Sequence, residues 1–180
     1  MTEINPSLLS TLLDYNQSTG NLTWRRRSVD MFHGNCRIAS AWNSRYAGRP
    51  AFSAMRNGYN CGSIFGKVFQ AHRVIWALVN GTWPESEIDH INHDRSDNRI
   101  ANLRLASRGE NARNQGQNRN NTSGASGVYF VKRRSKWLAR VVCDGVSVYE
   151  GYFHTRDDAI TAREAQMAAF GYHPNHGRAF

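Results

Sequence analysis

The stretch that decides the fold of this chain is EIDHINHDRSDNRIANLRLASRGENARN, residues 87–114. Its first five residues indicate a short strand, and a polar loop rich in Asn and Asp follows at 92–102. Residues 103–105 predict a second short strand. Ser107 and Glu110 match a capping box, which predicts that a helix begins there. The stretch therefore predicts a strand, a loop, a strand and a helix in close succession.

The same stretch carries side chains suited to phosphodiester hydrolysis, which requires an activated water and a cation. A neutral His90 can accept the proton of a water, and Asp89 and Asn111 offer the hard oxygen ligands that suit Mg²⁺ or Mn²⁺. Neighbours in a regular strand point to opposite faces, so Asp89 and His90 share a site only if the strand ends or twists there. Asn98 and Asn102 stay open between a role in the site and ordinary turn residues.

Upstream of this stretch, residues 71–80 have apolar side chains at helical spacing, and Gly81 is expected to end that helix. His72 and Arg73 begin the helix, and Arg73 is open between a phosphate contact and a structural cap. Residues 4–15 also predict a helix.

Further elements of the first half are less regular. Leu22 to Trp24 predict a short strand, and residues 28–56 show no clear period, so we interpret them as loop. Asn57-Gly58 predicts a turn, after which residues 59–70 predict short strands broken at Gly62 and Gly66.

Downstream, the polar residues 115–124 are typical of a linker. The segments that follow predict three strands, at 128–131, 137–142 and 146–153. Thr155 as N-cap and Gly171 as a stop then bound a helix with an alanine stripe, made of Ala159, Ala162, Ala165 and Ala169.

Strand alternation assigns the faces of this C-terminal sheet. Trp137 and Ala139 share the face expected to meet the alanine stripe, whereas Tyr129, Arg140 and Tyr149 are the candidates for an exposed DNA-binding face. Arginine can read guanine edges, while cations at the first turn are expected to bind phosphate. Those turn cations are Lys132, Arg133, Arg134 and Lys136. The alternative is a small stabilising domain with a solvated basic face.

Charge and cysteine content narrow the classes of function. The chain has 180 residues and a formal net charge of +9. Residues 1–60 carry seven Arg against three acids, residues 61–111 carry six of each sign, and residues 112–180 carry ten basic against five acidic residues. Two basic flanks suit a polyanion such as nucleic acid. The three cysteines form no C-x-x-C pair, which argues against a structural zinc site, and no apolar run has the length of a membrane span.

The stretch at residues 87–114 resembles the HNH motif of phage and intron-borne homing endonucleases, and the likeness extends to HRVIWALVNGTWP and LLDYNQSTGNLTW upstream. The resemblance implies a ββα-metal nuclease in which His90 is the general base and Asp89 and Asn111 hold one divalent cation, Mg²⁺ or Mn²⁺. It also implies that Asn102 braces the hairpin that orients His90. The family often has Gly where this chain has His93, which could shift the hairpin turn.

Residues 122–171 resemble the ethylene-response-factor type of DNA-binding domain, on the motifs Gly127-Val128, Lys136-Trp137 and Gly151-Tyr152-Phe153 and on the alanine-rich helix. The resemblance implies a three-stranded antiparallel sheet in the major groove with a helix packed behind it. The first turn is one residue longer than in the plant pattern, so contacts to individual bases do not carry over.

These observations predict an α+β protein: an HNH module at 1–114 with its core at about 72–114, a linker at 115–124, and a domain at 125–180 with a three-stranded sheet packed on one helix. The predicted function is metal-dependent cleavage of double-stranded DNA at a site chosen by the C-terminal domain. Arg73 and Arg113 join the candidate DNA contacts. We expect no membrane partner and a cytoplasmic location, in an infected host cell if a phage encodes the chain.

Some alternatives remain open on the sequence. One rival is a DNA-binding regulator with an inactive nuclease module, and another is a degradative nuclease without sequence preference. The choice between monomer and homodimer is also open, as is the choice between nicking and cutting both strands.

Overall fold

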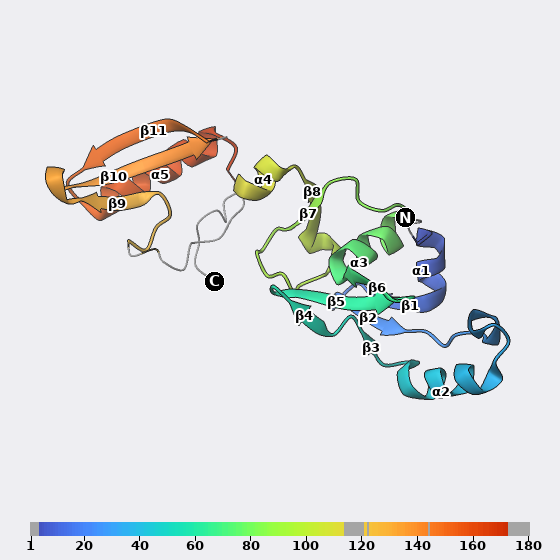
Figure 1. Cartoon of the computed structure of the whole chain (residues 1–180). Coiled ribbons are helices and arrows are strands. Elements are labelled where there is room, and N and C mark those ends of the chain that lie inside the picture. Colours follow the sequence, from blue (N-terminus) through green and yellow to red (C-terminus); the bar gives the residue numbers. More distant parts are fainter. Residues whose placement is uncertain (1–3, 114–120, 122, 144, 173–180) are drawn as a thin grey trace. The chain divides into compact units, whose positions relative to one another are not determined.

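The computed structural model describes residues 4–113, 121, 123–143 and 145–172. The chain divides into two compact units, Met1–Leu105 and Ala106–Phe180 (Figure 1). The division falls ahead of the segment predicted as a linker, 115–124, most of which lies outside the described residues. Within the described ranges no helix has both the length and the apolar character needed to cross a membrane.

The first unit is a mixed assembly of helices and small sheets, in which the strands pair in the orders β1-β2-β3, β4-β5-β6 and β7-β8. Its elements are α1 (Pro6–Leu12), β1 (Leu13–Asn16), β2 (Asn21–Trp24), η1 (Val29–Phe32), α2 (Cys36–Tyr46), β3 (Pro50–Ala51), β4 (Ala54–Arg56), β5 (Tyr59–Ile64), β6 (Lys67–Gln70), α3 (Ala71–Asn80), β7 (Glu87–His90), η2 (Ile100–Asn102) and β8 (Leu103–Ala106).

The N-terminal helix is shorter than its apolar pattern predicts. Asn5 caps it through a bond from the Ser7 amide, but the helix ends at Leu12 rather than at residue 15. Leu13 is extended instead, because β1 pairs with β2 in antiparallel register and Leu13 lies opposite Trp24. Pairing with a partner strand therefore overrides the helical spacing of the last apolar residues.

The interpretation of residues 28–56 as loop was wrong. The segment contains the helix α2, whose N-terminus is capped by the Asn35 side chain accepting from the Ile38 amide at 3.0 Å. Few apolar residues mark the helix, since its buried positions are Ala39 and Asn43 alone. A helix held by polar and aromatic contacts leaves little hydrophobic periodicity to detect.

Two tight turns shape the sheet β4-β5-β6. Asn57 and Gly58 are both left-handed, as the predicted turn between β4 and β5 requires. The expected break at Gly62 is absent, because β5 runs through it and an added Cβ there would lie 2.7 Å from the Phe52 ring. The strands break only at Phe65-Gly66.

The core of the first unit forms around α3, whose predicted bounds and Gly81 stop are confirmed. Val74, Ile75 and Ala77 are fully buried against α1 and the sheets. The same cluster includes Ile88 on β7 and Leu103 on β8, which attaches the polar hairpin between them to the core. The site described below thus rests on the largest hydrophobic cluster of the described residues.

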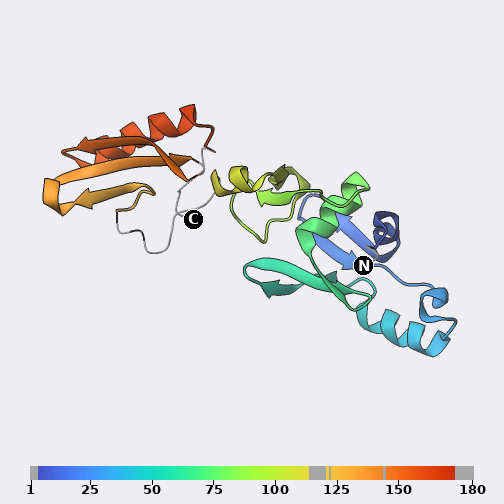
Figure 2. The same cartoon turned by 45° about the horizontal axis from the view of Figure 1, so that its top comes forward.

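The second unit contains α4 (Arg108–Arg113), β9 (Val128–Val131), η3 (Lys132–Arg134), β10 (Lys136–Cys143), β11 (Val146–Phe153) and α5 (Arg156–Ala169). Strand β10 is central in an antiparallel sheet of order β11-β10-β9, and α5 lies along one face of it, as Figures 1 and 2 both show. The predicted three strands and the helix with its Thr155 cap are confirmed to within a residue or two.

The alanine stripe expected on α5 was only partly right. Ala159 is fully buried against the sheet, but Ala165 and Ala169 are exposed, and the buried face continues through Arg163 and Met167. Residues four apart stay on one face of a helix, whereas steps of three drift around it by about 60° each.

Candidate active site

Strand β7 brings Asp89 and His90 to its end, and both side chains are buried, at 6% and 4% exposed. The strand ends at His90, where the chain turns so that the His93 amide donates to the His90 carbonyl at 2.9 Å. This ending removes the strict alternation that would send the two neighbours to opposite faces. His93 has φ 66°, a left-handed conformation that favours glycine. The histidine therefore adopts the backbone conformation of the turn with some strain.

His90 is surrounded by aromatic and amide groups. Its ring meets the edge of the His72 ring at 5.1 Å between centroids and the Tyr59 ring at 5.8 Å. Burial lowers the pKa of His90, against smaller opposing effects from the Asn98 hydrogen bond and from nearby carboxylates. The imidazole is therefore neutral at neutral pH, which is the form that can accept a proton.

The Asn98 amide sets which nitrogen of His90 carries the hydrogen. Asn98 Nδ2 donates to the Ser96 carbonyl at 3.1 Å, so its oxygen is the atom that faces His90 Nε2 at 3.2 Å. An amide oxygen only accepts, so Nε2 must donate and the basic lone pair is on Nδ1. Asn98 is thus more than the turn residue that the sequence left open.

Asn102 ties the two ends of the polar hairpin together. Its Nδ2 donates to Asn92 Oδ1 at 2.9 Å and to the Asp97 carbonyl at 2.8 Å, and its Oδ1 accepts from the Asn92 amide at 3.0 Å. The Asn102 carbonyl also accepts from the Ile91 amide. All of these bonds hold the segment directly after His90 in place.

The N-terminal hairpin braces the same loop, which the sequence did not predict. The Tyr15 hydroxyl donates to the Asn98 carbonyl at 3.1 Å and accepts from the Ile100 amide at 2.8 Å. Gly20, with φ 76°, passes so close that an added Cβ would lie 2.6 Å from the Arg99 amide nitrogen. A contact across more than eighty residues has no local signature in the sequence.

Asp89 is held by Arg104 on β8. Arg104 Nη2 and Nε lie 2.8 Å and 2.9 Å from the same oxygen, Asp89 Oδ2. Arg104 was not among the expected site residues, although its place two residues after Asn102 puts it on the paired strand. Both bonds fix the orientation of the buried carboxylate.

Two more carboxylates occupy the loop beyond His90. Hydrogen bonds from Arg99 lower the pKa of Asp97 to about 2, with a further contribution from Asn92. Bonds from Ser96 lower the pKa of Asp94. Both groups are therefore ionised at neutral pH, and Asp97 is paired with Arg99.

The helix start predicted at Ser107 is confirmed as a capping box. Ser107 Oγ accepts from the Glu110 amide at 3.2 Å, and Glu110 Oε2 accepts from the Ser107 amide at 2.8 Å. Asn111 lies on α4 and its amide donates to the Ser107 carbonyl. Because α4 belongs to the second unit, the placement of Asn111 beside Asp89 stays a prediction. The side chain of Arg113 lies outside the described residues.

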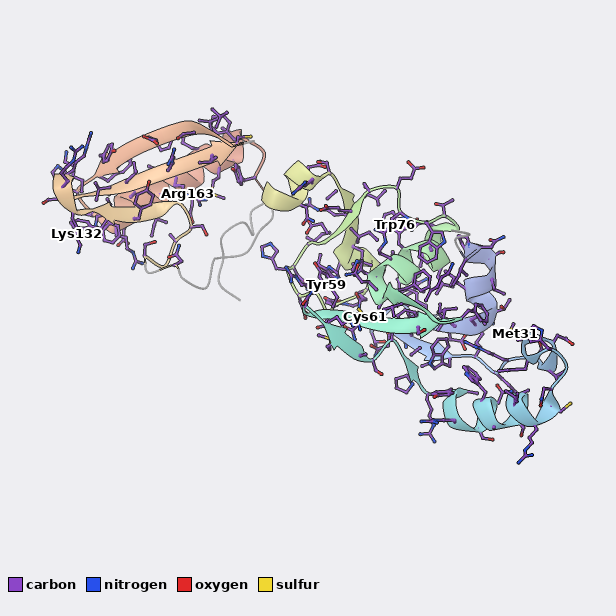
Figure 3. The ribbon with its side chains drawn as sticks, viewed as in Figure 1. Met31, Tyr59, Cys61, Trp76, Lys132 and Arg163 are labelled. Atoms are coloured by element: carbon purple, nitrogen blue, oxygen red, sulfur yellow. The ribbon has the colours of Figure 1, made fainter. Side chains whose placement is uncertain are left out.

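The helix α3 contributes two residues near the site. His72 is buried, and its burial, with smaller effects from His90 and Arg73, lowers its pKa to about 3. Arg73 donates to the carbonyls of Pro84 at 3.2 Å and Ser86 at 3.4 Å, which is the structural cap that the sequence left open. Figure 3 labels Tyr59, the ring that contacts both histidines from β5.

The DNA-binding candidates of the second unit lie on different faces of the sheet. Tyr129 is 44% exposed, and Arg140 is exposed but paired with Glu150 at 3.0 Å. The expectation that Tyr149 lies on that face was wrong. Tyr149 pairs with Val141 and packs in the core cluster with Ala139 and Ala159, since residues directly opposite across strands share a face.

The turn cations and a missed tyrosine complete the exposed side of this sheet. Lys132, Arg133 and Arg134 form the exposed turn η3, and Lys136 opens β10. Arg134 lies 4.3 Å from the ring centroid of Tyr152. Tyr152 is 37% exposed, and simple alternation from Tyr149 would have identified it.

Comparison with known proteins agrees with this geometry. Residues 69–113 match the family model described as HNH endonuclease. The chain is 35% identical over 92 residues to "Protein 3.8" of Escherichia phage T7, which is 51% of this chain and 74% of that protein. No solved structure matches the chain. The matched family segment contains Asp89, His90, Asn102 and Asn111, whereas Tyr15 and Tyr59 lie outside it.

Proposed function

This chain belongs to the HNH endonuclease family of phage-type nucleases, and from that premise we propose that it hydrolyses phosphodiester bonds of double-stranded DNA with His90 as the general base. The observation that carries the proposal is the state of His90. It is neutral, buried at the end of a strand, and oriented by Asn98 so that its lone pair is on Nδ1.

In the proposed mechanism, His90 Nδ1 accepts the proton of the water that attacks the scissile phosphate. Asn98 fixes the tautomer, and Asn102 holds the hairpin so that the ring keeps its orientation. Tyr59 and His72 exclude water from the other sides of the ring. A base positioned in this way typically contributes about 10²–10⁴-fold to the rate.

We also propose that Asp89 and Asn111 hold one divalent cation, Mg²⁺ or Mn²⁺. When bound, such a cation stabilises negative charge on the phosphate and the leaving oxygen. The donor chemistry fits, because Asp89 is a buried carboxylate at the end of β7 whose Oδ2 accepts from Arg104, and a carboxylate has further lone pairs for a cation. Among the described residues no group of three or more His, Cys, Asp or Glu could hold a metal, so amide, water and phosphate oxygens are needed.

The second unit is proposed to select the site of cleavage, as its resemblance to ethylene-response-factor domains implies. The exposed sheet face offers Tyr129 and Arg140 for contacts with bases, and the η3 turn offers three cations for phosphate. This assignment rests on exposure and charge, together with the sheet topology that the resemblance requires.

The ion pair between Asp89 and Arg104 favours a second candidate, a DNA-binding protein with a silent nuclease module. An arginine that occupies Asp89 Oδ2 competes with a cation for that oxygen. Arg104→Gln separates the two candidates, since it keeps a long polar side chain but removes the charge. A silent module would stay silent at any Mg²⁺ concentration, whereas a working one would need less Mg²⁺ in the variant.

Relaxation of a supercoiled plasmid tests the main proposal directly. Wild-type protein with Mg²⁺ is expected to produce nicked or linear DNA, and both products should disappear in EDTA. Asp89→Asn should require more Mg²⁺ for any remaining activity. Exposed Asp157, which is far from the HNH segment in sequence, provides the matched control as Asp157→Asn. Full activity in EDTA would reject the metal mechanism.

A further inference from the structure

The charges of the first unit are separated by sign along the chain. From residue 31 to residue 84 there is no Asp or Glu, while Arg37, Arg45, Arg49, Arg56, Lys67 and Arg73 occur there. Residues 85–98, which surround His90, hold five acids, at 85, 87, 89, 94 and 97, and one Arg. A surface that serves only solubility mixes both signs. Arg99 and Arg104 are paired with Asp97 and Asp89, so this segment has no surplus of positive charge to attract a phosphate backbone, and attraction must come from elsewhere.

The acid-free stretch contains α2, and α2 is firmly attached to the rest of the unit. Asn43 is buried and binds both backbone groups of Arg27: its Oδ1 accepts from the amide at 2.9 Å and its Nδ2 donates to the carbonyl at 2.9 Å. The Arg27 guanidinium lies 3.9 Å from the Trp42 ring centroid and 5.1 Å from that of Trp24. The helix is therefore a fixed platform rather than a loose insertion.

Arg27 is thus used for packing and Arg73 for backbone hydrogen bonds, whereas the remaining arginines of the acid-free stretch are exposed. Arg37, Arg45, Arg49 and Arg56 are exposed, and in the described part of the chain no ion pair joins any of them to an acid. These four residues are called the arginine surface below. By contrast, the exposed Arg25 is paired with Asp14 at 2.5 Å.

The four side chains come from neighbouring elements. Arg37 and Arg45 lie about two turns apart on α2, Arg49 lies three residues after the end of the helix, and Arg56 ends β4. Figures 1 and 2 show α2, β3 and β4 following one another along one side of the first unit, and Figure 3 shows side chains projecting outward from α2. Cations spaced along one side of a unit suit a linear polyanion.

We propose that the arginine surface binds the phosphate backbone of the duplex DNA substrate, as a contact separate from both the polar loop at residues 92–102 that follows His90 (the HNH loop) and the C-terminal sheet. The inference rests on the proposed nuclease function for its choice of polyanion. The β4–β5 turn connects the surface to the site, because Arg95 in the HNH loop donates to the Asn57 carbonyl at 2.9 Å and stacks on Tyr59. The surface supplies the attraction for phosphate that the acid-rich segment around His90 lacks.

The proposal is tested by the salt dependence of binding, without cleavage. Full-length His90→Ala protein in EDTA is titrated onto a fluorescent duplex of unrelated sequence at several KCl concentrations. Adding Arg37→Ala and Arg45→Ala should weaken binding and lower the slope of log K against log[salt] by about 1 for each arginine. Arg37→Lys with Arg45→Lys should restore the slope, since phosphate contacts need a positive charge rather than a planar fork.

The matched control removes the same charge from arginines that already have acidic partners, as Arg25→Ala with Arg156→Ala. The control should keep the wild-type slope to within about half a unit. Equal slopes for the two double variants, or an unchanged slope in Arg37→Ala/Arg45→Ala with an unchanged thermal melt, would overturn the proposal. Plasmid cleavage by the same arginine variants with His90 restored is a separate readout. Absence of cleavage in wild type as well would reject the nuclease function but leave the binding result intact.

Discussion

The HNH segment and the C-terminal sheet differ in how many polar side chains they bury. In the first unit, Asp89, His90, Asn98 and Asn102 are all buried, and thirteen buried hydrophobic residues form the core cluster beside them. In the second unit only three buried residues form the core cluster, and the charged side chains of the sheet lie outside. A large core supplies enough hydrophobic stabilisation to offset the desolvation of several polar groups, whereas the second unit buries a single charged side chain among its described residues, Arg163.

This difference predicts that the two regions respond differently to mutation, which experiments can test. Changes within the HNH loop should alter catalysis or stability strongly, because each buried polar group has specific partners. Changes on the exposed sheet should alter binding modestly, because exposed charges contact solvent as well as ligand.

The largest effect is expected for His90→Ala. Loss of the general base should lower the rate of plasmid cleavage by about 10²–10⁴-fold, while DNA affinity, which depends on Lys and Arg contacts with phosphate, stays close to that of wild type. Single-turnover cleavage and binding titrations measure the two separately. His154→Ala, which removes an exposed histidine of the second unit, is the control. Wild-type cleavage by His90→Ala would show that His90 is not the base.

Acid should destabilise the first unit through His72. Burial lowers the pKa of His72 from 6.5 to about 3, so below pH 6.5 the unfolded chain binds a proton that the folded chain excludes. The free energy of unfolding should therefore fall as the pH drops from about 6.5 to 3, by at most about 1.4 kcal/mol per pH unit for this one proton. Denaturant melts from pH 4 to pH 7 measure the slope. His72→Phe should flatten it and His154→Phe should not; identical slopes would contradict the assignment.

The contact between the N-terminal hairpin and the HNH loop should be sensitive to a single methyl group. Gly20→Ala combines a left-handed backbone with a Cβ 2.6 Å from the Arg99 amide nitrogen, so we expect a loss of about 1–3 kcal/mol in stability and slower cleavage. Gly34→Ala has a similar φ, 78°, with nothing within 4 Å of the Cβ. The difference between the two variants in thermal melts isolates the contact with the loop, and no difference would mean that the contact is unimportant.

A smaller effect is expected when only the Tyr15 hydroxyl is removed. Tyr15→Phe leaves the Asn98 carbonyl and the Ile100 amide without this partner. The free energy of unfolding should fall by about 1–3 kcal/mol, nearer the lower value because water can reach the half-buried site. Urea unfolding gives the value. Tyr46→Phe is the control on α2. If both variants melt alike, the hydroxyl does not brace the loop.

The smallest effects should come from the C-terminal sheet. Arg140→Ala should lower the ratio of specific to non-specific binding by about tenfold or less, because Glu150 already occupies part of the guanidinium. Arg133→Ala should weaken binding to all sequences and reduce the salt slope by about 1. Side-by-side titrations on specific and random duplexes compare them. Identical behaviour of the two variants would mean that the exposed sheet face is not the reading face.

Local patterns were enough to predict much of this molecule. The helix α3, the capping box at Ser107 and the strands of the C-terminal sheet were all predicted from spacing and turn residues, since each depends on neighbours within one turn or one strand. The helix α2 was missed because its attachment depends on Asn43 and Trp42 meeting Arg27, which no hydrophobic period records.

The candidate site was likewise predicted only where its residues are close together in the sequence. The motif placed Asp89, His90 and Asn102 in one short hairpin, because strand, loop and strand are adjacent in the chain. The partners that define the chemical state of these residues could not be predicted from the motif. Tyr59, His72 and Tyr15 come from elements distant in sequence, and the pairing of Asp89 with Arg104 depends on strand register.

By itself, the sequence determined the family, the order of elements in the HNH segment and in the C-terminal sheet, and the identity of the residues expected to do the chemistry, since these are properties of short-range pattern. Only the tertiary structure decided that His90 is neutral and which of its nitrogens donates, because burial and the orientation of the Asn98 amide come from packing. The same holds for Tyr149, which the pairing with Val141 turns into the core. Desolvation and hydrogen-bond direction depend on which distant segments come into contact, and local sequence spacing does not predict those contacts.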